Sequence, residues 1–216
     1  MSLKVFSQTL SIAGHEISFD LPADPEEMLQ HALAGEAAGA SDWDPYWGLL
    51  WAAAPKTAEL ILRHDWPTRP CSLELGCGVG LTGIAALIAG LSVTFSDHAP
   101  EAVQMAQSNA ARNGFSNAPG LVFDWRQPIA AQFDFIFGSD VLYDSAGHEP
   151  LLQTLAAMLS PGGQAWIGDA GRSNAPLFVR SALDAGWSVE LRDDHGLPLP
   201  DPQHLQYRLI VLHRAI

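Results

Sequence analysis

Short apolar runs alternate with amphipathic stretches along most of the chain. The apolar runs predict strands, and they cover residues 71–75, 91–96, 120–123, 133–138, 164–168, 186–191 and 206–212. Helical periodicity between them predicts helices, and these cover residues 80–89, 99–113, 147–159 and 174–185. Regular alternation of strand and helix is typical of a mostly parallel sheet covered by helices on both faces.

The segment 193–203, which joins the last two predicted strands, is rich in proline and has no helical pattern. Parallel neighbours need a longer crossover, so this pair is expected to be antiparallel. The pattern therefore predicts an α/β fold with a doubly wound, seven-stranded, mostly parallel sheet. We expect its last strand to run antiparallel to the others.

The N-terminal region has a different pattern. Residues 10–19 predict a hairpin around Ala13-Gly14, and Asp24-Pro25-Glu26-Glu27 predicts the start of a helix, with Asp24 as its cap. We find no internal repeat or low-complexity segment. The chain is therefore expected to form a single domain over 1–216, with an extension over 1–45 and the core over 46–216.

Charge and composition limit the partners. The chain has 11 Lys and Arg against 24 Asp and Glu, a formal net charge of −13, and 48% of its residues are hydrophobic. The hydrophobic content excludes a disordered chain. The negative charge argues against nucleic acid and favours a cationic target, such as a Lys- or Arg-rich protein or an amine. A solvated acidic surface that only keeps the chain soluble is the alternative.

Two further features concern location. Residues 75–96 carry no charge, but five glycines interrupt them, which favours strand, turn and helix over a membrane span. The start lacks the apolar run of a secretory signal. Cys71 and Cys77 would lie nearly 20 Å apart on a strand, too far for a disulfide. We therefore expect free thiols in a cytoplasmic protein, and without ligand-spaced clusters we expect no metal.

The strongest local motif is LELGCGVG at 73–80, a glycine turn between a strand and a helix. The next predicted strand ends in Asp97, where an acid commonly binds ribose hydroxyls. Gly78, Gly80 and Gly83 also match a dinucleotide motif, but Glu74 would repel a pyrophosphate and attract a sulfonium and an ammonium. The turn therefore favours S-adenosyl-L-methionine over a dinucleotide; glycines that only pack helix against strand are the alternative.

Four motifs resemble those of class I, seven-strand S-adenosylmethionine-dependent methyltransferases, and within them methyltransferase family 16, which contains many protein-lysine methyltransferases. They are YWGLLW at 46–51, ELGCGVGLTG at 74–83, Asp124-Trp125, and DVLY at 140–143. IGDAGR at 167–172 is also similar to a stretch of the electron transfer flavoprotein beta-subunit lysine methyltransferases, with Ala170 where those have proline.

The resemblance implies roles for the cofactor-binding residues. Glu74, Gly76 and Gly78 are expected to flank the methionine portion, and Asp97 to bind the ribose. Asp124 is expected to accept from the adenine amino group. The large flat indoles of Trp125 and Trp51 are expected to contact the adenine and to form the wall of the cofactor site, respectively. A helix cap for Asp97 and ordinary core packing for the two tryptophans remain the alternatives.

Asp140 and Tyr143 are the expected catalytic residues. Asp140 follows a predicted strand and Tyr143 lies one turn later, so the pair is expected to form an anionic and aromatic gate for the substrate. Asp140 would capture a lysine ammonium, with Tyr143 and Trp47 in cation–π contact; a cap and a buried Tyr are the alternative. Asp169 and Arg172, after the fifth predicted strand, are expected to pair with one another or to orient substrate.

The expected function is N-methylation of a lysine of a protein substrate by in-line displacement, with S-adenosyl-L-homocysteine as the second product. In-line displacement needs mainly alignment of the reacting atoms and no covalent intermediate. Two alternatives remain open at this point. One is a small-molecule N-methyltransferase that acts on an amine or pyridine metabolite, and the other is a non-catalytic binding module with the same fold.

Overall fold

The structure is a computed structural model, and it describes residues 4–24, 28, 45–200 and 206–214. The strands are β1 (Val5–Ile12), β2 (His15–Pro22), β3 (Cys71–Leu75), β4 (Ser92–Asp97), β5 (Gly120–Val122), β6 (Phe133–Ser139), β7 (Leu159–Asp169), β8 (Trp187–Arg192) and β9 (Arg208–Arg214). The helices are η1 (Pro45–Gly48), α2 (Ala53–Arg63), α3 (Leu81–Ile88), α4 (Pro100–Arg112), η2 (Ser145–Gly147), α5 (His148–Met158) and α6 (Ala175–Asp184).

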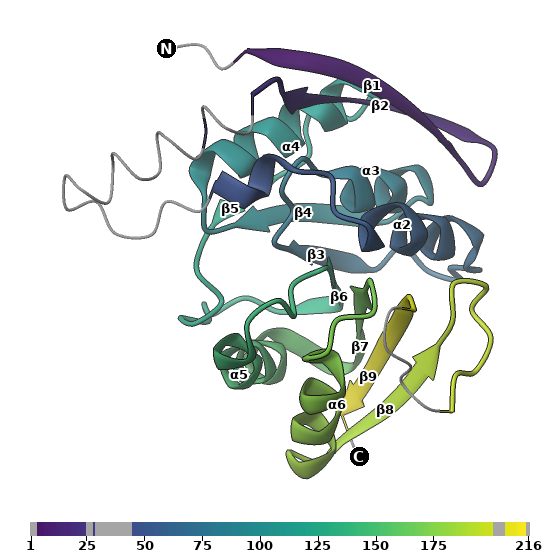
Figure 1. Cartoon of the computed structure of the whole chain (residues 1–216), viewed down its shortest axis with the longest axis vertical. Helices are drawn as coiled ribbons and strands as arrows, with labels where there is room; N and C mark the ends of the chain where they lie inside the picture. The colour runs from purple at the N-terminus through teal and green to yellow at the C-terminus, as the bar shows by residue number, and fades with distance from the viewer. Residues whose placement is uncertain (1–3, 25–27, 29–44, 201–205, 215–216) are drawn as a thin grey trace.

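Seven strands form one sheet in the order β5-β4-β3-β6-β7-β9-β8 (Figure 1). The pairs from β5 to β7 are parallel, whereas β9 pairs antiparallel with both β7 and β8. The predicted fold class is confirmed, including the single reversed strand. The chain leaves β3 toward β4 and later returns to β6 on the other side of β3. This reversal opens a crevice at the carboxyl ends of β3 and β6, where ligands bind in open α/β sheets.

Alternation along β3 and β6 divides the core between the two faces of the sheet. Leu73, Leu75 and Ile136 pack in one cluster with apolar residues of α5 and α6. Phe135 and Phe137 point the other way and pack with residues of α2. Glu74 also points to that second face, because its carboxylate accepts from the first turn of α3. The burial pattern thus places one acid among the apolar residues beneath the crevice.

The N-terminal hairpin of β1 and β2 turns at Ala13-Gly14, as predicted, and packs beside α4 (Figure 1). Two asparagines of α4 attach it. The side-chain amide of Asn109 donates to Asp20 O at 3.0 Å and accepts from Asp20 N at 2.8 Å. Asn113 forms the same pair of hydrogen bonds with the backbone of Ser18. The two side chains thus satisfy backbone groups of β2 as a neighbouring strand would. Asn109 Nδ2 also donates to the carbonyl of Val79, which ties the hairpin to the glycine turn.

Of the sheet strands, β7 differs most from its predicted range, whereas the others differ by at most two residues at either end. β7 begins at Leu159 rather than at 164, and it passes through Pro161-Gly162-Gly163, residues that ordinarily mark a turn. The pairing with β6 shifts between Phe133 and Phe135, and this irregularity accommodates the Pro-Gly-Gly segment within the strand. The helix predicted to begin at Pro25 lies outside the described residues.

Three findings concern the broad class of protein. Within the described parts of the chain, no helix has both the length and the apolar character needed to cross a membrane. Cys71 is exposed and Cys77 is buried, and both are free thiols. No cluster of His, Cys, Asp and Glu suited to a metal ion occurs among the described residues.

Candidate functional site

A cavity lies at the crevice where β3, β4 and β6 end, and the segment 46–51 forms part of its wall. Of the nine candidate residues chosen from the sequence, eight line this cavity: Trp51, Glu74, Gly76, Gly78, Asp97, Trp125, Asp140 and Tyr143. Asp124 is not in the lining. The topology thus gathers residues from five separate segments around one space.

The glycine turn forms the floor of the cavity in a backbone conformation that requires glycine. Gly76 and Gly78 both have positive φ, at 60° and 49°. A Cβ on Gly78 would lie 2.8 Å from the carbonyl oxygen of Trp47, and one on Gly76 would lie 3.0 Å from Val141. The YWGLLW and ELGCGVG motifs therefore touch each other, and larger residues would separate them.

Glu74 is a buried acid in the cavity wall, 3% exposed. Its Oε1 accepts from the backbone N–H of Gly83 at 3.1 Å, whereas Oε2 has no hydrogen-bond partner among the described residues. Burial raises the pKa of this carboxyl well above its ordinary value, and Asp97 adds to the effect. An unsatisfied acid in this position favours a cationic neighbour.

The carboxylate of Asp97 joins the glycine turn to the start of α4. Its Oδ2 accepts from Gly78 N–H and its Oδ1 from Ala99 N–H, both at 3.1 Å. His98 Nδ1 lies 3.3 Å from Oδ1. Asp97 is 6% exposed and lines the cavity. Its bond to Ala99 N–H resembles the helix cap that the sequence left as an alternative, although Ala99 itself is the N-cap residue of α4, and the ribose role stays a prediction.

Asp124 and Trp125 are neighbours in sequence with different surroundings. Asp124 forms an ion pair with Arg126, whose Nε lies 2.7 Å from Oδ2 and whose backbone N–H donates to Oδ1. Desolvation raises the pKa of Asp124, but these bonds outweigh it and the net pKa is lowered. A Cβ on Gly76 would lie 3.4 Å from the ring of Trp125, so that indole covers the glycine turn.

Asp140 directly follows β6 and has a left-handed conformation, with φ at 58°. Asp and Asn adopt this conformation at lower cost than most residues, and such strain concentrates at functional sites. Its Oδ2 accepts from the N–H of Ala53, the first residue of α2, at 2.7 Å. Its Oδ1 faces Arg172, with Nη2 at 3.2 Å and Nε at 3.3 Å. Both oxygens of Asp140 are thus occupied within the chain.

Arg172 has a nearer partner than the expected Asp169. The distance from Arg172 Nε to Asp169 Oδ2 is 3.9 Å, longer than the contacts to Asp140. Asp169 is fully buried; it accepts from the backbone N–H groups of Gly171 and Arg172, and it lies 3.4 Å from Arg208 Nε. Desolvation raises the pKa of Asp169. Asp169 therefore fixes the loop, while the Arg172 side chain reaches across to Asp140.

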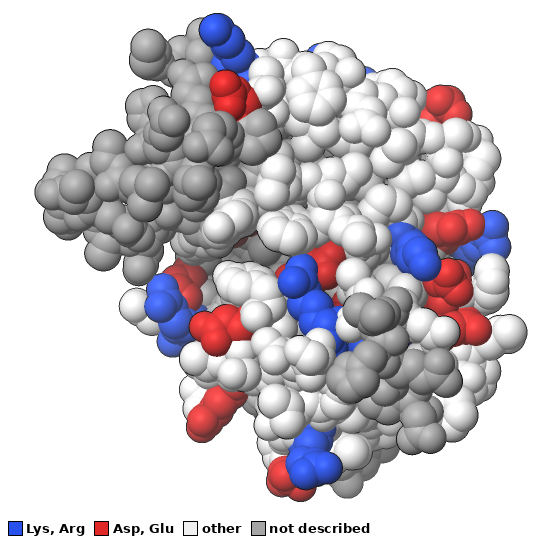
Figure 2. Space-filling model, in the orientation of Figure 1, with Lys and Arg blue, Asp and Glu red and all other residues white. Residues whose placement is uncertain are grey.

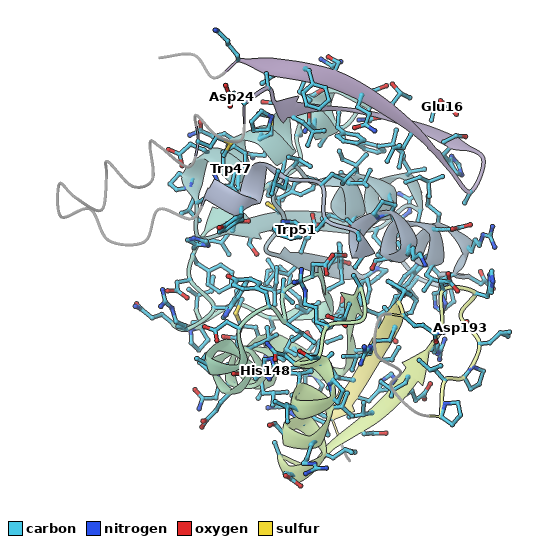
Figure 3. All side chains as sticks on the ribbon, in the orientation of Figure 1. Glu16, Asp24, Trp47, Trp51, His148 and Asp193 are labelled. Atoms are coloured by element: carbon cyan, nitrogen blue, oxygen red, sulfur yellow. The ribbon has the colours of Figure 1, made fainter. Side chains whose placement is uncertain are left out.

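Aromatic side chains form the rim of the cavity. Tyr46 and Tyr143 are each more than half exposed, and the indole N–H of Trp51 donates to Tyr46 O at 3.0 Å. The guanidinium carbon of Arg172 lies 5.3 Å from the centre of the Trp51 ring, a cation–π distance. Figure 3 shows Trp47 and Trp51 on the segment before α2, and Trp47 is buried rather than at the rim.

Charge is dispersed on this face of the molecule. Figure 2 shows acidic and basic side chains interspersed, with wide uncharged areas between them. The cavity lining itself contains three acids and one arginine: Glu74, Asp97, Asp140 and Arg172. The net charge of −13 therefore does not translate into one uniformly acidic surface on this face.

Sequence reasoning missed two kinds of lining residue. His98, Thr82 and Ser139 line the cavity, and the hydroxyls of Thr82 and Ser139 lie 3.2 Å apart. His98 directly follows Asp97 at the end of a strand, and this position could have predicted that it lines the cavity. Nothing in the local sequence around Thr82, within a helix, indicated a contact with Ser139 at the end of β6.

The sequence matches one protein family. A family profile described as lysine methyltransferase matches residues 48–175. The chain is 31% identical over 133 residues to the electron transfer flavoprotein beta subunit lysine methyltransferase of Danio rerio, a match that covers 60% of this chain and 52% of that one. It is 33% identical over 94 residues to the EEF1A lysine methyltransferase 3 of Xenopus tropicalis, covering 41% and 42%. The chain thus spans about half the length of the relatives it matches.

Solved structures show the same fold. A ribosomal protein L11 methylase from Lactobacillus delbrueckii subsp. bulgaricus superposes with a TM-score of 0.63 at 18% identity, over 78% of this chain and 81% of that chain. The glycopeptide N-methyltransferase MtfA, in complex with S-adenosyl-L-methionine, superposes with a TM-score of 0.63 at 13% identity, over 77% and 96%. At these identities the likeness concerns the fold.

Proposed function

The chain belongs to the lysine methyltransferase family, and on that premise we propose that it transfers a methyl group from S-adenosyl-L-methionine to a lysine of a protein. The observation that carries the proposal is that one continuous cavity joins the glycine turn to an aromatic and acidic rim. One end suits a nucleoside with a cationic centre, and the other suits the side chain of an acceptor.

The residues at the turn fit this methyl donor. Gly76 and Gly78 line the cavity without side chains, so a ligand can approach their backbone, and the buried, unsatisfied Oε2 of Glu74 favours a nearby cation. When bound, S-adenosyl-L-methionine supplies an electrophilic methyl group on a sulfonium. That positive charge favours the ionised form of Glu74, which stabilises it in turn and would offer nothing comparable to a neutral thioether.

The nucleoside end of the proposed site consists of Asp97, Trp125 and Asp124. Asp97 has its carboxylate at the cavity wall, where it can accept from ribose hydroxyls in addition to its backbone donors. Trp125 presents an indole face above Gly76 for the adenine. Asp124 can accept from the adenine amino group only while its carboxylate also accepts from Arg126, its partner within the chain.

The acceptor end must hold a lysine and favour its neutral form. Deprotonation of a lysine with a pKa near 10.4 costs about 4 kcal/mol at pH 7.5. Asp140 and Asp169 face Arg172 and Arg208, so an entering ammonium meets a carboxylate whose charge is already balanced by a guanidinium. Asp140 and Tyr143 then position the amine, while this balance, with the sulfonium, favours loss of its proton to water.

The proposed partner is a protein. The matched relatives are named for lysine methylation of the electron transfer flavoprotein beta subunit and of EEF1A. By analogy we propose a protein lysine as acceptor here as well, and S-adenosyl-L-homocysteine as the second product. We also propose a cytoplasmic location, since two free cysteines suit a reducing compartment.

Transfer of radiolabel tests this function. The purified chain is incubated with S-adenosyl-L-methionine labelled in its methyl group and with lysate of the source organism, and protein is then separated from metabolites. Label in protein that disappears when the lysate lysines are first blocked by reductive methylation supports the proposal. Label confined to small molecules overturns the protein substrate. Failure to bind both S-adenosyl-L-methionine and S-adenosyl-L-homocysteine in calorimetry overturns the enzyme.

A further inference from the structure

Arg172 places a cation at the acceptor end of the cavity. Its guanidinium lies between the Oδ1 of Asp140, at 3.2 Å, and the face of the Trp51 ring, at 5.3 Å. These three residues come from the end of β6, the loop after β7 and the segment before α2. A carboxylate opposite an indole face is the arrangement that recognises a positively charged side chain.

Asp140 can receive a second cation only if Arg172 moves. The Oδ2 of Asp140 is bonded to Ala53 N–H at 2.7 Å, which leaves Oδ1 as the oxygen that faces the cavity. The Asp140 side chain is 2% exposed, and the Arg172 side chain that covers it is 28% exposed. A substrate ammonium therefore meets Arg172 before it meets the carboxylate.

The loop after β7 provides a second carboxylate, that of Asp169, for the displaced guanidinium of Arg172. Asp169 Oδ2 lies 3.9 Å from Arg172 Nε, while the backbone of the loop stays bonded to Asp169 Oδ1 through Gly171 and Arg172. A change of side-chain rotamer can therefore exchange one carboxylate for the other without moving the loop. The cost of displacement is modest because Arg172 retains a charged partner.

We propose that Arg172 is a specificity-determining residue that occupies the acceptor site as an internal stand-in for the substrate cation. An incoming side chain must displace it from Asp140 and Trp51. This inference rests on the proposed function, because it assigns the acceptor end of the same cavity. Arg172 thereby restricts acceptors to cations on long unbranched side chains, because the Asp140 carboxylate lies beneath the partly exposed Arg172 guanidinium and the aromatic rim.

Binding of n-butylammonium, a lysine side-chain analogue, tests the inference without any methyl transfer. Ligand-observed NMR gives its dissociation constant for the wild type, Arg172→Gln and Arg172→Lys at constant ionic strength. We expect binding to Arg172→Gln to be about ten-fold tighter than binding to the wild type. Arg172→Lys retains a cation and should remain as weak a binder as the wild type.

The controls assign the effect to the site. Arg192→Gln removes an arginine that pairs with Glu190 on β8, and it should leave binding unchanged. The double variant Asp140→Asn/Arg172→Gln should lose the gain, and 1-butanol, a neutral analogue, should not distinguish the proteins. If Arg172→Gln does not fold, Arg172→Met makes the same comparison with the stem retained.

Equal affinity of the wild type and Arg172→Gln for n-butylammonium would overturn the inference, as would a gain that persists in the double variant. Failure of the proposed function has a different result, because it appears as absence of label transfer or of cofactor binding. The two conclusions are therefore tested by separate measurements.

Discussion

The two ends of the cavity are built on different principles. The glycine turn comes from one continuous stretch, residues 74–83, and its shape is set by backbone conformation and by close contacts that exclude larger residues. The acceptor end is assembled from three segments that are far apart in the chain, and ion pairs between side chains hold it together.

This difference has a physical consequence for substitutions. At Gly78, an added methyl group would conflict with the backbone carbonyl of Trp47, which cannot move away without moving the segment 46–51. At the acceptor end, removal of one charge leaves its partner unbalanced in a half-buried space. We therefore expect size changes to dominate at the first end and charge changes at the second.

The largest expected effect is that of Asp140→Asn. Asn tolerates the left-handed conformation of this residue, and its oxygen can still accept from Ala53 N–H, so the backbone is retained. The charge that faces Arg172 and the acceptor is lost. We expect methyl transfer to fall about 100-fold while the dissociation constant for S-adenosyl-L-homocysteine changes less than about three-fold. Rate assays and calorimetry measure the two quantities.

Asp134→Asn is the matched control for this prediction. Asp134 lies at the other end of β6, exposed, and accepts from Cys71 N–H. Its substitution should leave methyl transfer at the wild-type rate. Unchanged turnover in Asp140→Asn, with cofactor binding intact, would remove Asp140 from the proposed mechanism.

Gly78→Ala tests the turn end. An alanine here must adopt a left-handed φ, at a cost of about 1–2 kcal/mol, and its Cβ would meet the carbonyl of Trp47 at 2.8 Å. We expect affinity for S-adenosyl-L-homocysteine to fall about ten-fold or more, because the covering segment is pushed off the turn. Gly90→Ala shares the positive φ but meets no atom within 4 Å, so it should lower stability and leave affinity unchanged. Equal losses of affinity in both variants would contradict a steric cause.

Glu74→Gln, at the glycine-turn end, is expected to raise stability while it weakens binding of S-adenosyl-L-methionine. Burial raises the pKa of Glu74, so the folded chain holds a proton that the unfolded chain releases above its ordinary value of 4.5. Ionisation therefore lowers stability as pH rises from that value through the raised pKa. Gln keeps an acceptor for Gly83 N–H, and an unsatisfied amide costs less than an unpaired buried charge.

The thermal midpoint of Glu74→Gln should accordingly exceed that of the wild type by a few °C at neutral pH. The gain should shrink as the pH falls toward 4.5. The same variant should bind S-adenosyl-L-methionine less well relative to S-adenosyl-L-homocysteine, since only the former has a sulfonium. Glu16 is exposed, so Glu16→Gln is the control for a change of acid to amide. An equal rise of the thermal midpoint in that variant would show that burial of Glu74 is not the cause.

The same division explains what could be read from the sequence. The glycine turn, Asp97 and the mostly parallel sheet with its reversed last strand follow from local patterns, because each depends on neighbours in the chain or on the alternation of strand and helix. The bond from Asp140 to Ala53, the pairing of Asp124 with Arg126 and the Asn109 contact with β2 depend on side-chain geometry. No pattern of residue types distinguishes such contacts from other possible partners.

Most of these contacts also span long stretches of the chain, whereas Asp124 and Arg126 are only two positions apart. The contact between Thr82 and Ser139 spans 57 positions, and that between Asn109 and Asp20 spans 89. The start of β7 at Leu159, five residues before its predicted start at 164, was hidden by Pro161-Gly162, whose local preference for a turn is overridden by the pairing of Leu159 with Phe133 on β6. Residues that act through tertiary pairing are those that sequence alone did not place.

The smallest expected effect concerns an ion pair outside the cavity. Lys56 Nζ lies 2.8 Å from Asp194 Oδ2 and joins α2 to the loop after β8, but the two side chains are 44% and 40% exposed. Water screens such a pair, so a double-mutant cycle with Lys56→Met and Asp194→Asn should give a coupling of at most about 1 kcal/mol in the free energy of unfolding.

The same cycle applied to Arg172→Gln and Asp140→Asn should give a larger coupling, because the Asp140 side chain is 2% exposed. In about 1 M salt, where the screening length is near 3 Å, the coupling of Lys56 with Asp194 should vanish while that of Arg172 with Asp140 persists. Denaturant titrations of each variant set give both numbers. If the two couplings were equal and equally sensitive to salt, the charges at the acceptor end would be screened as an ordinary surface pair is. The proposed difference between the glycine-turn end, shaped by backbone conformation, and the acceptor end, held together by charges, would then be wrong.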